Sequence, residues 1–259
     1  MLKINNRKSN RVGEIRFNNF GSKMIIMKYN NRKDIDIYFP ATNYVVYNRA
    51  YKDFLNGQVS SLYDKTVLGI GYFGKGKYKC SINVERKSKV TSAYQCWSNM
   101  LHRCYDNKLH KKRPTYKDCI VLEEWLNFQK FAKWHEENYY QVGEEEMHLD
   151  KDILVKGNKV YSPETCIFVP IRINSLFKTN NSSNLPIGIS TKLLKYAANC
   201  RDENLNNTYL GIFETIEEAF NVYKLHKEKV IKLIAEKYKG GIPKKLYDAM
   251  YNYKVEITD

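Results

Sequence analysis

A short segment, MHLDKDIL at residues 147–154, carries an imidazole and two carboxylates at alternate positions, those of His148, Asp150 and Asp152. In an extended strand, alternate side chains lie on the same face. Carboxylates bind divalent cations, and both group types accept protons in catalysis. The segment therefore has the outline of a metal-dependent catalytic site. The alternative is an exposed strand, in which His148 and Asp152 are surface residues.

The surrounding sequence predicts how these groups are positioned. HLDKDIL is typical of a strand, and VKGNKVYSPE of a turn with a short return strand. TCIFVPIRINSLF then leads toward a helix that contains Asn174. We expect a strand, a turn, a strand and a helix over residues 147–177. Asn158, after Gly157, either fixes the turn through its side chain or is a simple Gly-Asn turn residue.

Residues 91–140 have helical periodicity. A first helix, which Thr91 or Ser92 can cap, has apolar residues at spacings of three and four: Tyr94, Trp97, Met100, Leu101 and Cys104. A second helix has on one face Trp125, Phe128, Phe131, Ala132 and His135. We predict that these aromatic residues form a core, with a base-stacking surface as the alternative. A loop between the helices contains three candidate DNA contacts in a row, Lys111, Lys112 and Arg113.

Residues 12–90 are rich in β-formers. KMIIMKY, DIDIYF and NYVVYN are strand candidates, separated by polar turn residues. The glycines of GIGYFGKGKY fit neither a phosphate-binding loop nor a dinucleotide fingerprint, so we interpret this segment as a linker or hairpin. The sequence predicts a small, basic, β-barrel-like module.

The C-terminal part begins after a polar linker, NNSSNLP, at residues 180–186. We predict three short strands, at IGIS, KYAANC and TYLGIF. Residues 214–238 are predicted to form an amphipathic helix with Thr215 and Glu218 as a capping box. The buried stripe of this helix is predicted to be Ala219, Phe220, Tyr223, Val230 and Ile234. The sequence therefore predicts a three-stranded sheet packed on one helix. The whole chain is predicted to be α+β, with domains at 1–90, 91–179 and 180–259.

The charge of the chain is concentrated near the N-terminus. The formal net charge is +15, and residues 1–90 hold 18 Lys and Arg against 6 Asp and Glu. A polyanionic partner, most simply nucleic acid, explains this excess. The alternative is a Lys-rich and Asn-rich protein from an A/T-rich genome. The sequence has no apolar run long enough for a membrane span and no secretory signal at its N-terminus.

The six cysteines form no C-x-x-C pair, which favours a reducing compartment such as the cytoplasm. The spacing of four of them matches no standard zinc pattern. We therefore favour buried free thiols over a zinc site at Cys96, Cys104, Cys119 and Cys166.

Residues 93–177 resemble the HNH endonucleases of phages and mobile introns, which fold as a ββα-metal finger. The resemblance is carried by YQCWSNMLHRCY, LEEWLNFQKFAKW, LDKDILVKGN and SPETCIFVPIRIN. It implies that Asp150 and Asn174, 24 residues later, bind Mg²⁺ or Mn²⁺. It also implies that Asn158 is the middle residue of the motif, which fixes the turn.

Lys151 occupies the place where the family has its general-base histidine. A lysine is normally protonated near pH 7 and cannot accept a proton. Three alternatives follow. Lys151 binds phosphate as a cation in a weakened site, His148 acts as the base in its place, or the metal alone activates water. If Lys151 holds the base position, Lys151→His should raise activity.

Residues 186–237 resemble the DNA-binding domain of plant ethylene-response factors, which also occurs fused to HNH nucleases. KYAA, TYLGIFET and EEAFNVY carry this resemblance. It implies a sheet that lies in the major groove of duplex DNA, with candidate contacts at Lys192, Lys195, Asn199 and Arg201. Ser190 stands where the family usually has an arginine. The alternative for each residue is an ordinary exposed strand position.

These observations together lead us to expect a metal-dependent endonuclease that acts on double-stranded DNA in the cytoplasm of a host cell. A DNA-binding protein with a degenerate, inactive HNH finger is the first alternative. A protein-interaction module with an incidentally basic surface is the second. The sequence identifies no protein partner.

Overall fold

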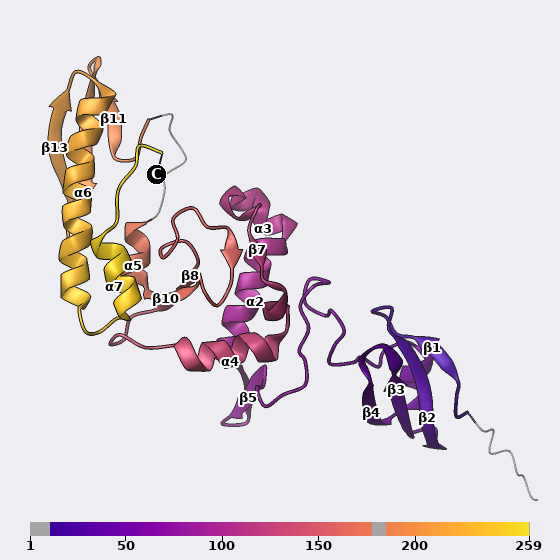
Figure 1. Cartoon of the computed structure of the whole chain (residues 1–259). Coiled ribbons are helices and arrows are strands. Elements are labelled where there is room, and N and C mark those ends of the chain that lie inside the picture. Colours follow the sequence, from indigo (N-terminus) through magenta and orange to yellow (C-terminus); the bar gives the residue numbers. More distant parts are fainter. Residues whose placement is uncertain (1–10, 178–184, 259) are drawn as a thin grey trace, which may run out of the picture. The chain divides into compact units, whose positions relative to one another are not determined.

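The computed structural model describes residues 11–177 and 185–258, so most of the predicted linker at 180–186 lies outside the described residues. The chain forms two compact units, residues 1–136 and 137–259 (Figure 1). Both contain helices and strands, which confirms the α+β prediction. The boundary falls within the predicted second domain, so the domain limits predicted at 90 and 179 do not coincide with this division.

The first unit begins with an antiparallel sheet of four strands in sequence order, β1 (Ile15–Phe17), β2 (Lys23–Asn31), β3 (Asp34–Phe39) and β4 (Tyr44–Arg49). A 3₁₀ turn, η1 (Pro40–Thr42), precedes β4, and a short helix, α1 (Tyr51–Leu55), follows it. One face of the sheet buries Met24, Ile26, Ile35, Ile37 and Phe39.

The prediction of a barrel-like module is wrong. In the described part of the chain, β1 and β4 are the edges of an open sheet and do not pair with each other. Closure into a barrel needs more and longer strands with a consistent tilt, and β1 has only three residues.

The glycine-rich segment at 69–78 is a linker and contains no regular strand. Its backbone forms hydrogen bonds with residues 126–128, with Tyr72 N–H donating to Leu126 O and Phe128 N–H donating to Tyr72 O. At Gly71 a Cβ would lie 2.4 Å from Leu101 Cδ1, so a larger residue would require the buried Leu101 side chain to shift. A hairpin, β5 (Ser81–Val84) and β6 (Lys87–Val90), follows the linker.

The helical part of the first unit consists of α2 (Ser92–Tyr105), α3 (Asn107–Lys112), η2 (Pro114–Tyr116), β7 (Ile120–Val121), η3 (Glu123–Leu126) and α4 (Phe128–Asn138). Thr91 caps α2 through its hydroxyl, which accepts from Tyr94 N–H. Trp97 and Phe128 are fully buried with ring centroids 5.4 Å apart, so the aromatic residues form a core as predicted. The basic run at 111–113 ends α3, where a loop was predicted.

The second unit contains β8 (Met147–Asp150), β9 (Val160–Tyr161), β10 (Ile167–Pro170) and α5 (Ile171–Leu176). β8 and β10 are antiparallel, with His148 opposite Val169 and Asp150 opposite Ile167. The predicted order of strand, turn, strand and helix is therefore present. The first strand ends at Asp150, earlier than predicted, because the Asp150 carboxylate accepts the backbone N–H groups of Asp152 and Ile153 and closes a turn.

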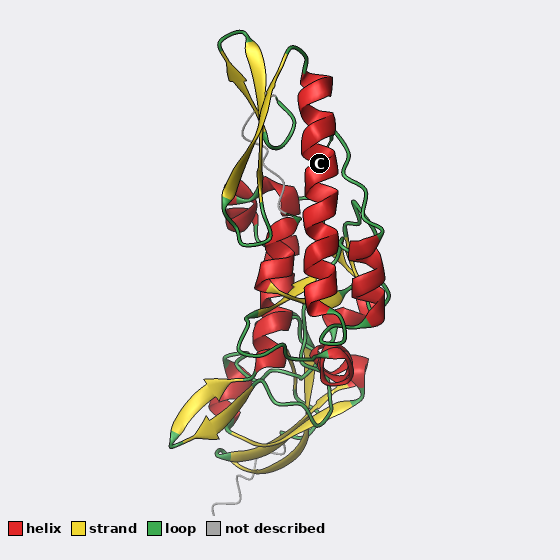
Figure 2. Cartoon of the chain, turned by 90° about the vertical axis from the view of Figure 1, so that its left-hand side faces the viewer, coloured by secondary structure: helices red, strands yellow, loops and turns green. Residues whose placement is uncertain are grey.

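The C-terminal part is a three-stranded antiparallel sheet, β11 (Ile189–Lys192), β12 (Lys195–Arg201) and β13 (Asn207–Phe213), followed by α6 (Ile216–Tyr238) and α7 (Lys244–Tyr251). The capping box of Thr215 and Glu218 is present. Figures 1 and 2 show α6 running along the sheet and continuing beyond it. Its buried residues include every residue of the predicted stripe, which confirms a sheet packed on one helix.

A single core joins the C-terminal sheet to the region of β8, β10 and α5. It contains Val169 and Ile173 together with Ala198, Ile231 and Leu246. At 23 residues α6 is about 34 Å long, so it packs against the sheet with one part and against α7 with another. Short strands and a six-residue helix bury little apolar surface alone, which explains why they share this core. Within the described residues, no helix combines the length and apolar character needed to cross a membrane.

Candidate functional site

The predicted site residues meet where α5 packs beside β8. His148 and Asp150 lie opposite Val169 and Ile167 in the sheet, so their side chains are on the face that carries these two core residues. Asn174, on α5, lies 26 residues from His148 in the chain, yet its Nδ2 is 2.9 Å from His148 Nδ1. The structure thus brings together residues from the two ends of the predicted motif.

The contact between His148 and Asn174 involves one ring nitrogen of the histidine. With the amide nitrogen of Asn174 as the donor, Nδ1 of His148 is the acceptor. The other ring nitrogen, Nε2, lies 3.2 Å from Glu146 Oε1. His148 is therefore held between a carboxylate on one nitrogen and Asn174 on the other. Glu146, which immediately precedes β8, was not singled out from the sequence.

Asp150 is a carboxylate whose charged form is disfavoured. Its Oδ1 accepts the N–H groups of Asp152 and Ile153 at 2.9 and 2.8 Å. Burial raises the pKa of the Asp150 carboxyl to about 6, and the neighbouring Asp152 carboxylate adds to the rise. The two N–H groups and Lys151 lower the pKa of Asp150 and so partly offset this rise. A cation placed beside Asp150 would favour the ionised form.

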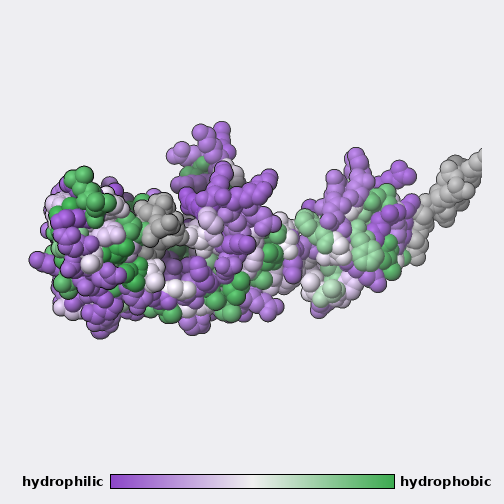
Figure 3. All heavy atoms as spheres, turned by 90° about the horizontal axis from the view of Figure 1, so that it is seen from above, coloured by the Kyte–Doolittle hydropathy of each residue, from purple (hydrophilic) through white to green (hydrophobic). Residues whose placement is uncertain are grey.

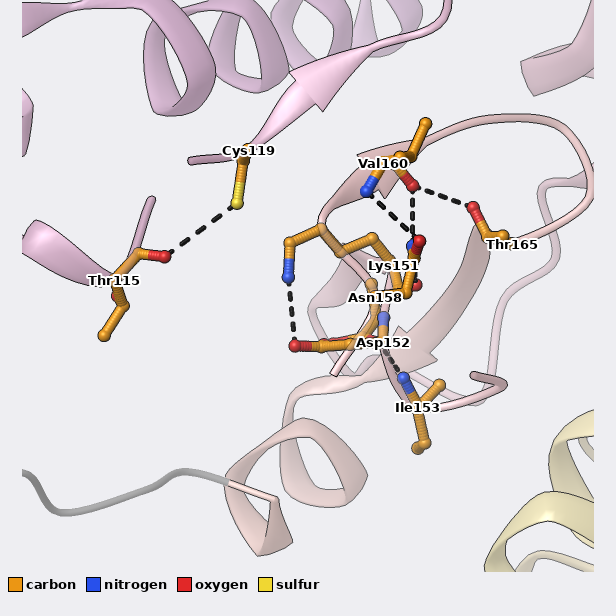
Figure 4. A network of polar contacts seen from close by, with 9 residues as sticks. Thr115, Cys119, Lys151, Asp152, Ile153, Asn158, Val160 and Thr165 are labelled. Atoms are coloured by element: carbon orange, nitrogen blue, oxygen red, sulfur yellow. Dashed lines mark hydrogen bonds and ion pairs between the residues drawn. The ribbon is translucent and has the colours of Figure 1, made fainter. Parts of the chain in front are cut away.

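Lys151 is buried, with 6% of its surface exposed. Its Nζ donates to Asp152 Oδ2 at 2.9 Å (Figure 4) and lies 5.9 Å from the centre of the Tyr161 ring. The side chain of Asp152 is about half exposed. The ammonium group of Lys151 thus faces the Asp152 carboxylate and an aromatic ring, and its own burial leaves little access for a phosphate.

Asn158 fixes the turn after β8 through its side chain (Figure 4). Its Nδ2 donates to the carbonyl oxygens of Lys151 and Val160, both at 2.7 Å, and its Oδ1 accepts from Val160 N–H. Of the two sequence interpretations, the side-chain role is the one observed. Gly157 has a φ of 75°, which a glycine adopts without strain.

The oxygen ligands that Asp150 and Asn174 offer near β8 and α5 are of the type that binds a hard divalent cation. Asp150 Oδ2 accepts no hydrogen bond from a described residue, and the Asn174 amide contributes a second oxygen. Mg²⁺ prefers such oxygen ligands and keeps several waters, so Asp150 and Asn174 are of the ligand types that suit it. In the part of the chain that the structure describes, no group of three or more His, Cys, Asp and Glu residues is placed to hold a metal.

The cysteines considered for zinc form no disulfide in the described part of the chain. Cys104, Cys119 and Cys166 are buried. Cys119 Sγ donates to Thr115 O at 3.9 Å (Figure 4). Burial raises the pKa of Cys96 to about 12.

The candidate DNA contacts of the C-terminal sheet share its outer face. We define this sheet's outer face by Ser190, Lys192, Lys195, Ala197, Asn199, Arg201, Asn207, Tyr209 and Ile212, because Ala198 and Cys200 between them face the core. Lys192 lies with its Nζ 5.5 Å from the ring centre of Tyr209, and Lys195 forms an ion pair with Glu214. Asn199 is half-buried, whereas Lys192 and Arg201 are exposed.

Tyr209 was missed by the sequence analysis, although it is 55% exposed on this face. Its position in the strand-like TYLGIF, alternating with residues of the other face, was the available signal. Lys111, Lys112 and Arg113 are exposed in the first unit.

Comparisons of the chain with protein-family models, with curated proteins and with solved structures gave no match. Functional inference therefore depends on the residues and their geometry.

Proposed function

We propose that this protein is an HNH-like endonuclease that hydrolyses phosphodiester bonds of duplex DNA in the cytoplasm of its host cell. One observation carries the proposal: His148 and Asn174, from β8 and α5, are in hydrogen-bond contact on the face of β8 that also carries Asp150. An imidazole, a carboxylate and an amide at one place are the groups that a metal-dependent nuclease needs.

Asp150 and Asn174 are the residues that would hold Mg²⁺ or Mn²⁺. A divalent cation bound there supplies stabilisation of the charge that develops on the phosphate and on the leaving oxygen. Asp150 is oriented for this role by the two backbone N–H groups that hold Oδ1, so that Oδ2 is the oxygen left for a ligand.

His148 is the general base in this proposal. Its Nδ1 is unprotonated when Asn174 donates to it, and Glu146 supports the tautomer with the proton on Nε2. When a ligand engages the Asn174 amide oxygen and turns that amide away, Nδ1 becomes free to take a proton from water. Lys151 is assigned to the structure of the turn, since its Nζ is buried against Asp152.

Duplex binding is assigned to the outer face of the C-terminal sheet. Lys192, Asn199 and Arg201 present one ammonium, one amide and one guanidinium group on adjacent strands. An ammonium or guanidinium group binds phosphate, and an amide can read a base edge. Lys111, Lys112 and Arg113 are proposed as additional phosphate contacts from the first unit.

The alternative is a DNA-binding protein with an inactive finger. The burial and ion pairing of Lys151 favour it, because the position after Asp150 then offers no proton acceptor. The two functions differ in one outcome, namely whether bound DNA is cut.

A plasmid-nicking assay tests the proposal. Asp150→Asn and Asn174→Ala should each reduce Mg²⁺-dependent nicking by at least about 100-fold. The matched control is Asp248→Asn. This change on α7 removes a charge and an exposed ion pair with Lys244, and the variant should cut as the wild type does. DNA retention without cleavage by the wild-type protein would instead establish the inactive binder.

A further inference from the structure

The sheet of the first unit has a second face, opposite its core, that is exposed and apolar. Because Met24, Ile26 and Ile37 face the core, the residues that alternate with them face outward. We call this the outer face of the N-terminal sheet; it consists of Ile15, Phe17, Lys23, Ile25, Met27, Lys28, Asp36, Tyr38, Val45 and Tyr47.

Four apolar side chains of this face are well exposed to solvent. Phe17 is 65% exposed, Tyr47 60%, Ile15 50% and Met27 48%. Figure 3 shows hydrophobic residues, in green, on the visible surface of the N-terminal region at the right, among hydrophilic ones in purple. Single exposed apolar residues are ordinary, but a set of this size on one sheet face indicates a binding surface.

The exposed charges on this face are basic, and none forms an ion pair with a described residue. Lys23 and Lys28 are both exposed, and neither forms an ion pair with a described residue. The face also carries Asp36, but this carboxylate is buried and accepts the backbone N–H of Asn48 at 3.2 Å. Arg32 and Lys33, at the turn between β2 and β3, add positive charge at one end of the sheet. The occupant is therefore expected to be anionic.

We propose that the outer face of the N-terminal sheet binds single-stranded nucleic acid, with bases stacked on Phe17 and Tyr47 and phosphates beside Lys23 and Lys28. Exposed aromatic rings with nearby lysines are the general means by which proteins hold single strands. Bases in a duplex stack on each other and offer no free face. Phe17 and Tyr47 are on the two edge strands, about 14 Å apart across the sheet and about four residues, or 13 Å, apart along the strands, so that about 19 Å separates them, a span that a short oligonucleotide covers. This surface is independent of the proposed nuclease site.

Binding of a fluorescein-labelled oligo-dT 12-mer to the full chain in EDTA, followed by fluorescence anisotropy, tests this inference. The variant Phe17→Ala/Tyr47→Ala should bind the 12-mer about 10- to 100-fold more weakly, while its affinity for a duplex of equal length changes less than about twofold. The matched control is Leu225→Ala/Tyr251→Ala, which removes two exposed apolar side chains from α6 and α7 and should bind as wild type does.

A second pair of variants separates charge from stacking. Lys23→Gln/Lys28→Gln should reduce the slope of log affinity against log salt by about 1.4, whereas the aromatic variant should keep the wild-type slope. An unchanged affinity of the aromatic variant, or an equal loss for duplex and single strand, would overturn the proposal. A wild-type dimer in gel filtration that Phe17→Ala/Tyr47→Ala converts to a monomer would also overturn it, because the face would then join two copies of the chain.

Discussion

Asn174 on α5 donates from Nδ2 to Nδ1 of His148 on β8, over a distance of 2.9 Å. This contact joins a helix to the strand that carries Asp150, and it engages one nitrogen of the imidazole. It also makes Asn174 a residue with two possible partners, His148 through its nitrogen and a cation through its oxygen.

The first prediction concerns the base. His148→Ala should reduce nicking about 100-fold or more, since general-base catalysis contributes on that scale. Lys151→Met should keep most of the activity, because the methionine fills the buried space of the lysine stem and Asp152 can be solvated. Single-turnover cleavage rates of the two variants decide between the residues. Activity lost in Lys151→Met and kept in His148→Ala would reverse the assignment.

The variant Lys151→His gives an independent check on the same assignment. The sequence predicts a gain of activity if residue 151 holds the base position. The burial of Lys151 and its ion pair with Asp152 lead us to expect no gain. An increase in cleavage rate would show that a histidine at 151 reaches the reacting water.

A second prediction separates the function of Asp150 from its structural role. Asparagine keeps an oxygen that can accept from Asp152 and Ile153 N–H and removes a charge that burial disfavours. In EDTA, Asp150→Asn should therefore have a Tm equal to or above that of the wild type. Asp150→Ala loses the acceptor and should be less stable than Asp150→Asn by about 2 kcal/mol. Calorimetry of the three proteins measures both differences, and a Tm of Asp150→Asn as low as that of Asp150→Ala would contradict the account.

The third prediction concerns the turn after β8. Asn158→Ala removes three hydrogen bonds and should lower the free energy of unfolding by about 2–3 kcal/mol in urea denaturation. Asn252→Ala loses one exposed hydrogen bond, to Asp248 O, and should cost less than about 1 kcal/mol. Equal effects of the two substitutions would show that Asn158 does not fix the turn.

A pH dependence of stability follows from His135. Burial lowers the pKa of this histidine in the folded protein. The unfolded chain then takes up a proton near pH 6.5 while the folded chain resists it, so stability is lost as the pH falls below about 6.5. Urea midpoints measured from pH 7.5 to pH 5 should fall, and they should fall less in His135→Gln. The same slope in both proteins would contradict this assignment.

The fifth prediction concerns duplex binding. Lys192→Ala/Arg201→Ala should weaken binding to duplex DNA and reduce the slope of log affinity against log salt by about 1.8, if both residues contact phosphates. Lys111→Ala/Lys112→Ala tests the basic end of α3 in the same way. A salt slope unchanged in the Lys192 and Arg201 variant would exclude these phosphate contacts.

Much of the fold could be predicted because local signals agreed with the tertiary structure. Thr215 and Glu218 marked the start of α6, and the spacing of Trp97, Met100 and Leu101 marked the buried side of α2. The barrel was wrongly predicted because strand closure depends on long-range pairing, which short apolar runs such as that of β1 do not specify. Likewise, no local pattern indicated that β8, β10 and α5 share a core with α6 and α7.

The candidate site was predicted in part. Asp150, Asn158 and Asn174 could be chosen from the motif, and the hydrogen bonds of Asn158 agree with its predicted role in the turn. The burial of Lys151 and the contact between His148 and Asn174 could not be predicted, because both depend on how α5 and the turn pack on β8. The outer face of the N-terminal sheet was also missed, since Phe17 and Tyr47 are recognised only when the register of β1 to β4 is known.

The most direct test of the proposed function is incubation of the full chain with supercoiled plasmid in Mg²⁺, Mn²⁺ or EDTA, with Asp150→Asn beside the wild type. The account predicts nicked or linear DNA with either metal, none in EDTA, and at least about 100-fold less product from Asp150→Asn. Intact plasmid in every lane, together with a gel shift that shows binding, would contradict an endonuclease and leave a DNA-binding protein.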